Sequence, residues 1–140
     1  MIRLATPADR PALARLQSRL AEPSPGLLDG ALDDASLTPA TALVSVDGDE
    51  PVGYLLAVPG DGTVYVAELV VAPDHRREGR ARALLSACAD RASDATPSLT
   101  VTVAPDNEPA RALYEDCGFE GVRRLPDFFE DGPGLLYRRD

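Results

Sequence analysis

The sequence predicts one α/β (α+β) domain, in which a mixed sheet of about six to seven strands is flanked by about four helices. Three observations lead to this prediction. The length of 140 residues suits a single compact domain. Segments with the period of a strand alternate with segments of helical period along the chain. No segment has the composition of a linker and no repeat is present, so the domain is expected to span residues 1–140.

In the first half of the chain, the apolar pattern predicts strands, one helix and one irregular segment. Thr6 is expected to cap that helix, because Thr is favoured before a helix and Pro7 suits the first helical position. Residues 22–38 combine Pro, Gly and Asp with leucines, which predicts a loop containing a short helix. The Asp47-Gly48 turn predicts a hairpin. The expected strands are residues 2–4, 42–46, 52–58 and 63–71.

In the second half, helices alternate with strands until a final pair of strands. One helix is expected from about Gly79 to Ser93 and another from about Glu108 to Cys117. Asn107 is a suitable N-cap for the second of these, and Gly118 is suited to end it. The expected strands are residues 99–103, 119–125 and about 135–138.

The basic and reactive side chains exclude several classes of enzyme. All 14 basic residues are arginines, which excludes the lysine chemistry of Schiff bases, pyridoxal phosphate and Walker-A phosphate loops. His75 is the single histidine, and Cys88 and Cys117 do not form a CxxC motif. These residues supply neither the usual zinc ligands nor a dithiol redox motif, and we predict no metal.

The charge and the hydropathy pattern limit the partners. A net charge of −9 argues against nucleic acid, because a phosphate backbone is recognised first through clustered basic charge. The acidic composition indicates either adaptation to a salt-rich cytoplasm or a compositional bias of the genome, and the sequence leaves both open. No apolar stretch approaches the ~18 residues of a membrane span, and the first ten residues lack a signal-peptide core. We therefore expect a cytoplasmic protein without a membrane partner.

Residues 69–81 carry the most informative motif of the chain. An apolar strand ends at Pro73, and a loop with the pattern Arg76-x-x-Gly79-x-Ala81 leads into a helix. Unpaired N–H groups at a helix start, together with the helix dipole, favour binding of a pyrophosphate. Arg77 stands where a dinucleotide-binding motif would have its second glycine. The alternative is an ordinary strand-to-helix turn with solvated charges.

A second motif spans residues 107–119 and follows the next strand. It has the sequence Asn-Glu-Pro-Ala-Arg-Ala-Leu-Tyr-Glu-Asp-Cys-Gly-Phe and includes Tyr114. Helix capping alone would account for Asn107 and Gly118, and core packing would account for Tyr114. The two motifs in this order, about 30 residues apart, favour a functional interpretation over these alternatives.

Together the two motifs resemble those of the GNAT superfamily of N-acetyltransferases. The resemblance implies acetyl-CoA as donor and direct attack of an amine on the thioester. It implies that the strands splay after Val71 and Val103 to form a slot for the thioester. Ala81 stands where glycine is commoner, and His75 where tyrosine is often found. The implied cofactor-binding residues are Leu69, Val70 and Val71 for the pantetheine arm, Arg76, Arg77, Glu78, Gly79, Arg80 and Ala81 for the pyrophosphate, and Asn107 and Tyr114 for the pantetheine and thioester.

Two residues are candidates for the chemistry. The phenol of Tyr114 is the candidate general acid that protonates the departing thiolate. Glu68 is the candidate general base, because it is the lone carboxylate in the apolar run VYVAELVV. The alternatives for Glu68 are an ion pair with an arginine or a position at a sheet edge, with a water chain serving as the base. His75, in the phosphate loop, is expected at the surface.

The acceptor is expected to be a primary amine, either a peptide α-amine or a small amine. The tail resembles the C-terminal hairpin of ribosomal-protein alanine acetyltransferases, with Phe128 and Phe129 in place of a Tyr-Tyr pair as an apolar substrate wall. Residues 22–37 would form the opposite wall, where Glu22, Asp29, Asp33 and Asp34 either attract a cationic amine or only contribute surface charge.

Two other functions remain open. One is a non-catalytic acyl-CoA sensor on the same fold, and the other is a small nucleotide-binding or hydrolase domain. The absence of lysine and of an Asp-rich metal motif weighs against the second. The protein is expected to be a monomer or a homodimer.

Overall fold

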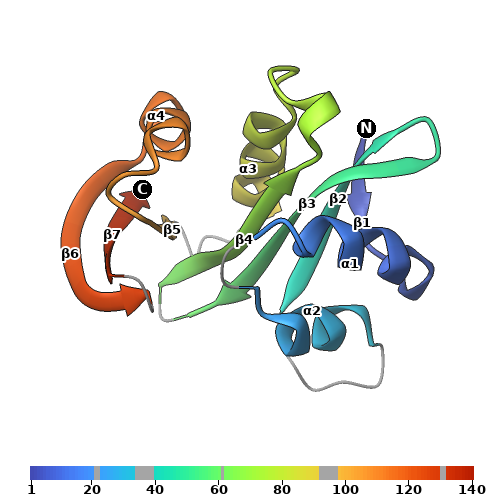
Figure 1. Ribbon diagram of the computed structural model, residues 1–140, viewed down its shortest axis with the longest axis horizontal. Coiled ribbons are helices and arrows are strands. Elements are labelled where there is room, and N and C mark those ends of the chain that lie inside the picture. The colour runs from blue at the N-terminus through green and yellow to red at the C-terminus, as the bar shows by residue number, and fades with distance from the viewer. Residues whose placement is uncertain (21–22, 34–39, 61, 92–97, 130–131) are drawn as a thin grey trace.

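The computed structural model describes residues 1–20, 23–33, 40–60, 62–91, 98–129 and 132–140. Within these residues, seven strands form one mixed sheet in the order β1-β2-β3-β4-β5-β7-β6 (Figure 1). The predicted α+β domain with a single mixed sheet is confirmed. The strands are β1 Ile2–Leu4, β2 Thr41–Asp47, β3 Glu50–Pro59, β4 Thr63–Val71, β5 Ser98–Val103, β6 Glu120–Phe129 and β7 Gly132–Arg139.

The described helices occur in the predicted order. They are α1 Arg10–Gln17, α2 Pro25–Leu32, α3 Arg80–Arg91 and α4 Glu108–Asp116, with short 3-10 turns at Pro7–Asp9 and Pro73–His75. Several boundaries differ from expectation. A 3-10 turn precedes α1. β6 extends four residues past Leu125, and β7 begins at Gly132, because the two strands pair as far as Phe129 and Gly132. Ser93, the expected end of α3, lies outside the described residues. No helix in the described part of the chain is long and apolar enough to cross a membrane.

Helices cover both faces of the sheet, and each face has its own apolar cluster (Figure 1). Successive strand residues point to opposite faces, so Leu43 and Leu55 pack on the side of α3 and α4, whereas Val44 and Leu56 pack on the side of α1 and α2. The helical residues that complete the two clusters are Leu84, Leu85, Cys88 and Tyr114 on the first side, and Leu13, Leu16, Leu28 and Leu32 on the second.

The strands β4 and β5 run side by side for only part of their length. Their parallel pairing begins at Thr63 and ends at the pair Val66–Val101. Beyond this pair, β4 stays with β3 as far as Val71, and β5 stays with β7. The prediction that the strands splay after Val71 and Val103 is therefore wrong in position, although the splay itself is present.

A β-bulge at Ala67 provides the physical reason. Glu68 pairs with Leu56 and Val66 pairs with the next residue of β3, which leaves Ala67 without a partner on that strand. A bulge bends its strand and increases the local twist. The bend directs the second half of β4 away from β5 and opens the sheet one residue after Val66.

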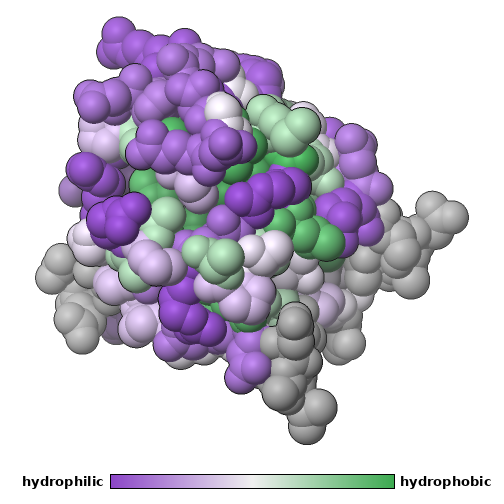
Figure 2. Space-filling model, turned by 90° about the vertical axis from the view of Figure 1, so that its right-hand side faces the viewer, coloured by the Kyte–Doolittle hydropathy of each residue, from purple (hydrophilic) through white to green (hydrophobic). Residues whose placement is uncertain are grey.

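The exposed large apolar side chains of the described residues lie at the two edges of the sheet. Met1 and Leu4 belong to the β1 edge, and Val122 and Phe128 belong to the β6 edge. Figure 2 shows the face beside α1 and β1, where an apolar area is surrounded by hydrophilic residues. The hydrophilic surroundings agree with the net charge of −9.

The buried carboxylate of Asp9 joins β1 to the first helix. It accepts hydrogen bonds from Nη1 and Nη2 of Arg3 at 2.7 and 2.9 Å, and from the backbone N–H of Thr6 at 2.8 Å. The bonds from Arg3 hold the pKa of Asp9 below its ordinary value. A carboxylate with a lowered pKa stabilises the fold above its unfolded-state pKa, and this stabilisation is lost as the pH falls through the folded-state value.

We expect Asp9→Asn to lower the free energy of unfolding near pH 7 by about 1.5–3 kcal/mol, as for hydrogen bonds to charged groups. The difference should shrink below about pH 4, where the carboxylate becomes protonated in the unfolded state, and it should vanish once the pH has fallen through the lower folded-state pKa. Urea unfolding of both proteins at the two pH values measures this change. The control is Asp29→Asn, because Asp29 pairs with Arg10 at the surface, where an ion pair contributes about 0–1 kcal/mol. Equal losses in the two variants would contradict the role of Asp9.

Candidate active site

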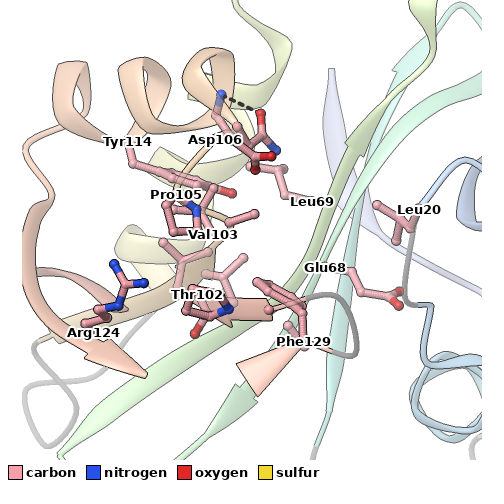
Figure 3. Close-up of a pocket in the computed structure, with 18 residues that line it drawn as sticks. Leu20, Glu68, Leu69, Thr102, Val103, Pro105, Asp106, Tyr114, Arg124 and Phe129 are labelled. Atoms are coloured by element: carbon pink, nitrogen blue, oxygen red, sulfur yellow. Dashed lines mark hydrogen bonds between the residues drawn. The ribbon is translucent and has the colours of Figure 1, made fainter. Parts of the chain in front are cut away.

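A pocket of about 620 Å³ lies where β4 and β5 diverge (Figure 3). Its volume is in the range of small-molecule sites. Its walls come from the bulged part of β4, the end of β5 with the following loop, α4, and the hairpin of β6 and β7. The lining residues include Leu20, Glu68, Leu69, Thr102, Asp106, Asn107, Tyr114, Arg124, Phe129 and Pro133.

The edge of β4 that faces the pocket is free of strand pairing from Ala67 to Val71 in the described structure. Leu69 lines the pocket, whereas the side chains of Val70 and Val71 are buried. One carbonyl of this segment is taken, because Nε of Arg76 donates to the oxygen of Val71 at 3.2 Å. An extended ligand with amide groups can add to such an edge as a further strand.

The loop between β4 and α3 presents backbone N–H groups at a helix start. Arg77 and Gly79 both have positive φ, at 63° and 77°. The N–H of Ala83 closes the first turn by donating to the carbonyl of Gly79 at 2.9 Å, and the earlier N–H groups of a helix have no intrahelical partner. Successive N–H groups in a turn can form an anion-binding concavity. The loop is therefore a candidate site for a pyrophosphate.

Several side chains of this loop bind other parts of the protein. Nη1 of Arg80 donates to Oγ of Ser45 at 3.0 Å and to the carbonyl of Val46 at 3.3 Å. Nε of Arg80 donates to Glu78 at 2.8 Å, and this hydrogen bond lowers the pKa of Glu78. These contacts tie the loop to β2 and occupy the guanidinium of Arg80. His75, expected at the surface, is half-buried, with Nδ1 3.5 Å from Glu78.

Tyr114 extends from α4 into the pocket (Figure 3). The residue is 7% exposed, and its ring packs against those of Phe119 and Tyr137. Its hydroxyl makes no hydrogen bond to any described residue, yet it is not sealed from solvent. Burial raises the pKa of Tyr114 to about 12, so the phenol stays protonated at neutral pH. The structure thus presents an unpaired phenol O–H to the pocket.

Asn107 also lies at the pocket, where it caps α4. Its Oδ1 accepts a hydrogen bond from the N–H of Ala110 at 3.3 Å. The loop that carries it is held by Arg111, which donates to the carbonyl of Pro105 at 2.8 Å and to Tyr137 at 3.0 Å. Capping therefore accounts for the side-chain oxygen of Asn107, whereas its side-chain nitrogen has no partner among the described residues.

The carboxylate of Glu68 is buried and surrounded by hydrogen-bond donors. Oε1 accepts from the hydroxyl of Tyr54 at 2.8 Å and from Nε2 of Gln17 at 3.0 Å. Oε2 accepts from the N–H of Ser24 at 2.7 Å and from the same Gln17 nitrogen at 3.3 Å. The donors come from β3, α1 and the start of α2. Burial of Tyr54 raises the pKa of its hydroxyl above the ordinary value, and the hydrogen bond to Glu68 and the negative charge of Glu68 raise it further.

The predicted substrate walls are placed only in part. Phe129 lines the pocket, whereas Phe128 is outside the lining, 45% exposed and edge-on to Phe129. Asp29 pairs with Arg10, and neither Asp29 nor Asp33 lines the pocket. The predicted contributions of Glu22 and Asp34 fall outside the described residues.

Three residues of the site were not singled out from the sequence. Gln17 interrupts the apolar spacing of α1, and this polar residue on an apolar face is a signal for a buried polar partner. Tyr54 stands in the apolar run of β3, and a buried tyrosine hydroxyl needs a partner. Arg124 gives no comparable signal, because it is one of two successive arginines on an exposed strand.

The chain is similar to known acetyltransferases. Residues 10–119 match the acetyltransferase (GNAT) family. The chain is 38% identical over 87 residues to the mycothiol acetyltransferase of Clavibacter sepedonicus, covering 62% of the chain and 28% of that protein. It is 35% identical over 127 residues to the mycothiol acetyltransferase of Kocuria rhizophila, covering 85% and 39%. The chain thus spans well under half the length of these curated relatives.

Solved structures show the same fold across the whole chain. The ribosomal-protein-S18-alanine N-acetyltransferase from Escherichia coli superposes with a TM-score of 0.82 at 20% identity, covering 99% of the chain and 92% of that structure. Ard1 from Thermoplasma volcanium gives 0.84 at 23%, covering 99% and 95%. A GNAT family acetyltransferase from Elizabethkingia anophelis, with acetyl-CoA bound, gives 0.82 at 21%, covering 100% and 97%.

The fold and the family match define the class of protein. The family match covers most of the chain, and the chain belongs to the acetyltransferase (GNAT) family. The resemblance inferred from the two sequence motifs is confirmed.

Proposed function

We propose that this domain transfers an acetyl group from acetyl-CoA to a primary amine. The observation that carries the proposal is the pocket at the divergence of β4 and β5. It is bordered by the free edge of β4 and by the hydroxyl of Tyr114, which has no partner among the described residues. The family match supports acetyl transfer as the reaction.

Three features of the structure would bind the three parts of acetyl-CoA: its pyrophosphate, its pantetheine arm and its thioester. The loop of residues 76–81 would hold the pyrophosphate through its backbone N–H groups, with Arg77 the loop arginine that has no partner among the described residues. The free edge of β4 at residues 69–71 would pair with the amides of the pantetheine arm. The thioester would then reach the divergence beyond Val66, beside Tyr114 and Asn107.

The chemistry requires one bond exchange and three proton movements. The amine nitrogen attacks the thioester carbonyl carbon, a C–N bond forms, and the C–S bond breaks. The departing thiolate takes the hydroxyl proton of Tyr114, whose raised pKa keeps that proton in place until the thiolate forms. The proton lost by the amine passes to water in the open pocket, from which the phenolate is reprotonated.

For Glu68, the contacts favour a fixed anionic anchor over a direct base. A carboxylate has about four lone-pair sites, and the four hydrogen bonds from Gln17, Tyr54 and Ser24 occupy them. The anchor joins α1 and the start of α2 to the bulge of β4. Its negative charge at the pocket wall favours a cationic amine over a neutral acceptor.

We expect Glu68→Gln to raise KM for the amine and to leave the shape of the pH profile of kcat/KM unchanged. A glutamine keeps most of the packing but removes the charge, whereas loss of a general base would also remove the acidic limb of the profile. Initial rates across a pH series measure both quantities. Disappearance of the acidic limb would contradict the anchor role and favour Glu68 as the base.

The acceptor class is tested by turnover. The named acceptors of the relatives differ, so their names support acetyl transfer without fixing the acceptor. We expect thiol release from acetyl-CoA with at least one group among N-terminal peptides, amino acids, polyamines and aminoglycosides. Turnover confined to alcohols or thiols would overturn the amine assignment. Tight CoA binding without any turnover would favour the acyl-CoA sensor.

A further inference from the structure

Arg124 is a positive charge on the side of the pocket formed by β6 and β7. It lies on β6 and lines the pocket together with Glu68, Asp106 and Phe129. Among the lining residues it is the single cation, in a protein whose net charge is −9. Its guanidinium makes no ion pair or hydrogen bond with any described residue. An arginine that lines a pocket and has no partner among the described residues is available to a ligand.

The register of β6 accounts for the direction of this side chain. Gly121 pairs with Tyr137, and Arg123 pairs with the next residue of β7, so Val122 is an extra, bulged residue. Arg124 consequently pairs with Leu135. Residues two apart on a strand point to the same face, so Leu135 and Tyr137 share a face of β7. Cross-strand partners also lie on one face, so Arg124 points to that face as well. The ring of Tyr137 contacts Tyr114 there.

The pocket is therefore polarised. In Figure 3, Arg124 and Glu68 lie on opposite sides of the pocket, with Thr102 and Phe129 between them. The carboxylate of Glu68 accepts hydrogen bonds from other side chains of the protein, whereas the guanidinium of Arg124 has no partner among the described residues. A ligand that carries a cationic and an anionic group complements both sides.

We propose that Arg124 selects amine acceptors that carry a carboxylate on the same molecule, by binding that carboxylate with its guanidinium. The planar guanidinium matches a carboxylate in two parallel hydrogen bonds. The carboxylate comes either from a free amino acid or from an acidic side chain near a peptide N-terminus. This inference rests on the proposed acetyl transfer to amines and narrows its acceptor.

The experiment compares acceptors that differ only in the carboxylate. One arm pairs alanine with alaninamide, and the other pairs the peptide Ala-Asp-Ala-amide with Ala-Asn-Ala-amide. We expect kcat/KM to favour the carboxylate by about tenfold or more in at least one arm, the effect of one charge-assisted contact, and that arm identifies the source. Equal rates for acid and amide in both arms would overturn the role of Arg124 and leave acetyl transfer to amines intact.

Variants of two adjacent arginines assign the preference to one side chain. Arg124→Gln should remove the preference, and Arg124→Glu should invert it toward amines with a second cationic group. Arg123→Gln is the matched control, because Arg123 is equally exposed on β6 but does not line the pocket, and it should keep the preference. A preference that survives Arg124→Gln would overturn the proposal. Turnover of a polyamine or an aminoglycoside, with none of these four acceptors used, would overturn this inference and leave acetyl transfer to amines intact, whereas no turnover with any amine would end both.

Discussion

We expect Gly79→Asp to abolish CoA binding, with a rise in Kd on the order of 100-fold or more by calorimetry. The carboxylate would occupy the open space in front of α3, where a Cβ on Gly79 meets no protein atom within 4 Å. It would place negative charge where the helix dipole and the free N–H groups favour a phosphate. An unchanged Kd would exclude the loop of residues 76–81 as the pyrophosphate site.

Two controls separate this effect from backbone strain. Gly79 has a φ of +77°, which an L residue adopts at some cost, so Gly79→Ala measures the strain without the charge. Gly62→Asp places the same side chain at a φ of +68° in open space at the turn before β4. Both controls should retain CoA binding, and a comparable loss in either would assign the effect to strain or to general destabilisation.

We expect Tyr114→Phe to lower kcat by about 100-fold or more and to leave the Kd for CoA unchanged. The lost O–H acts only when the thiolate forms, so the change affects the transition state and spares the bound ground state. Because burial raises the pKa of Tyr114 to about 12, the wild-type kcat should not fall through loss of this proton until the pH nears that value. Steady-state rates and CoA titrations of the variant measure the two effects.

Tyr65→Phe is the matched control for Tyr114. The hydroxyl of Tyr65 donates to Oγ1 of Thr102 at 3.1 Å, and Tyr65 does not line the pocket. The control therefore removes a neighbouring phenol that is already bound within the protein. A normal rate in Tyr114→Phe would reduce Tyr114 to a packing residue, and an equal loss in both variants would indicate a general change in the site.

Most of the fold could be predicted because its determinants are local. Continuous apolar runs in β2 and β3, helical spacing in α1, and Asn107 as a cap each act within a few residues of sequence. The bulge at Ala67 could not be predicted, because the sequence VYVAELVV is compatible with a regular strand. The point at which β4 and β5 separate depends on this bulge, so the sequence alone predicts the separation too far along β4.

The candidate site was predictable to the extent that it lies on the two motifs. Asn107 and Tyr114 belong to one helix and its N-cap, and Glu68 stands out as a lone carboxylate in an apolar strand. The partners of Glu68 are far away in sequence: Gln17 is 51 positions distant, and the N–H of Ser24 is 44. Contacts at such separations depend on tertiary packing, so spacing rules give no access to them. Arg124 reaches the pocket through the register of β6 and β7, which is equally non-local.

A structure of the protein with CoA tests the central claim most directly. The claim predicts the pyrophosphate on the N–H groups of residues 76–81, the pantetheine amides paired with β4 at residues 69–71, and the sulfur beside Tyr114 where β4 leaves β5. CoA bound elsewhere on the protein, or bound here with its sulfur outside the pocket, would contradict it.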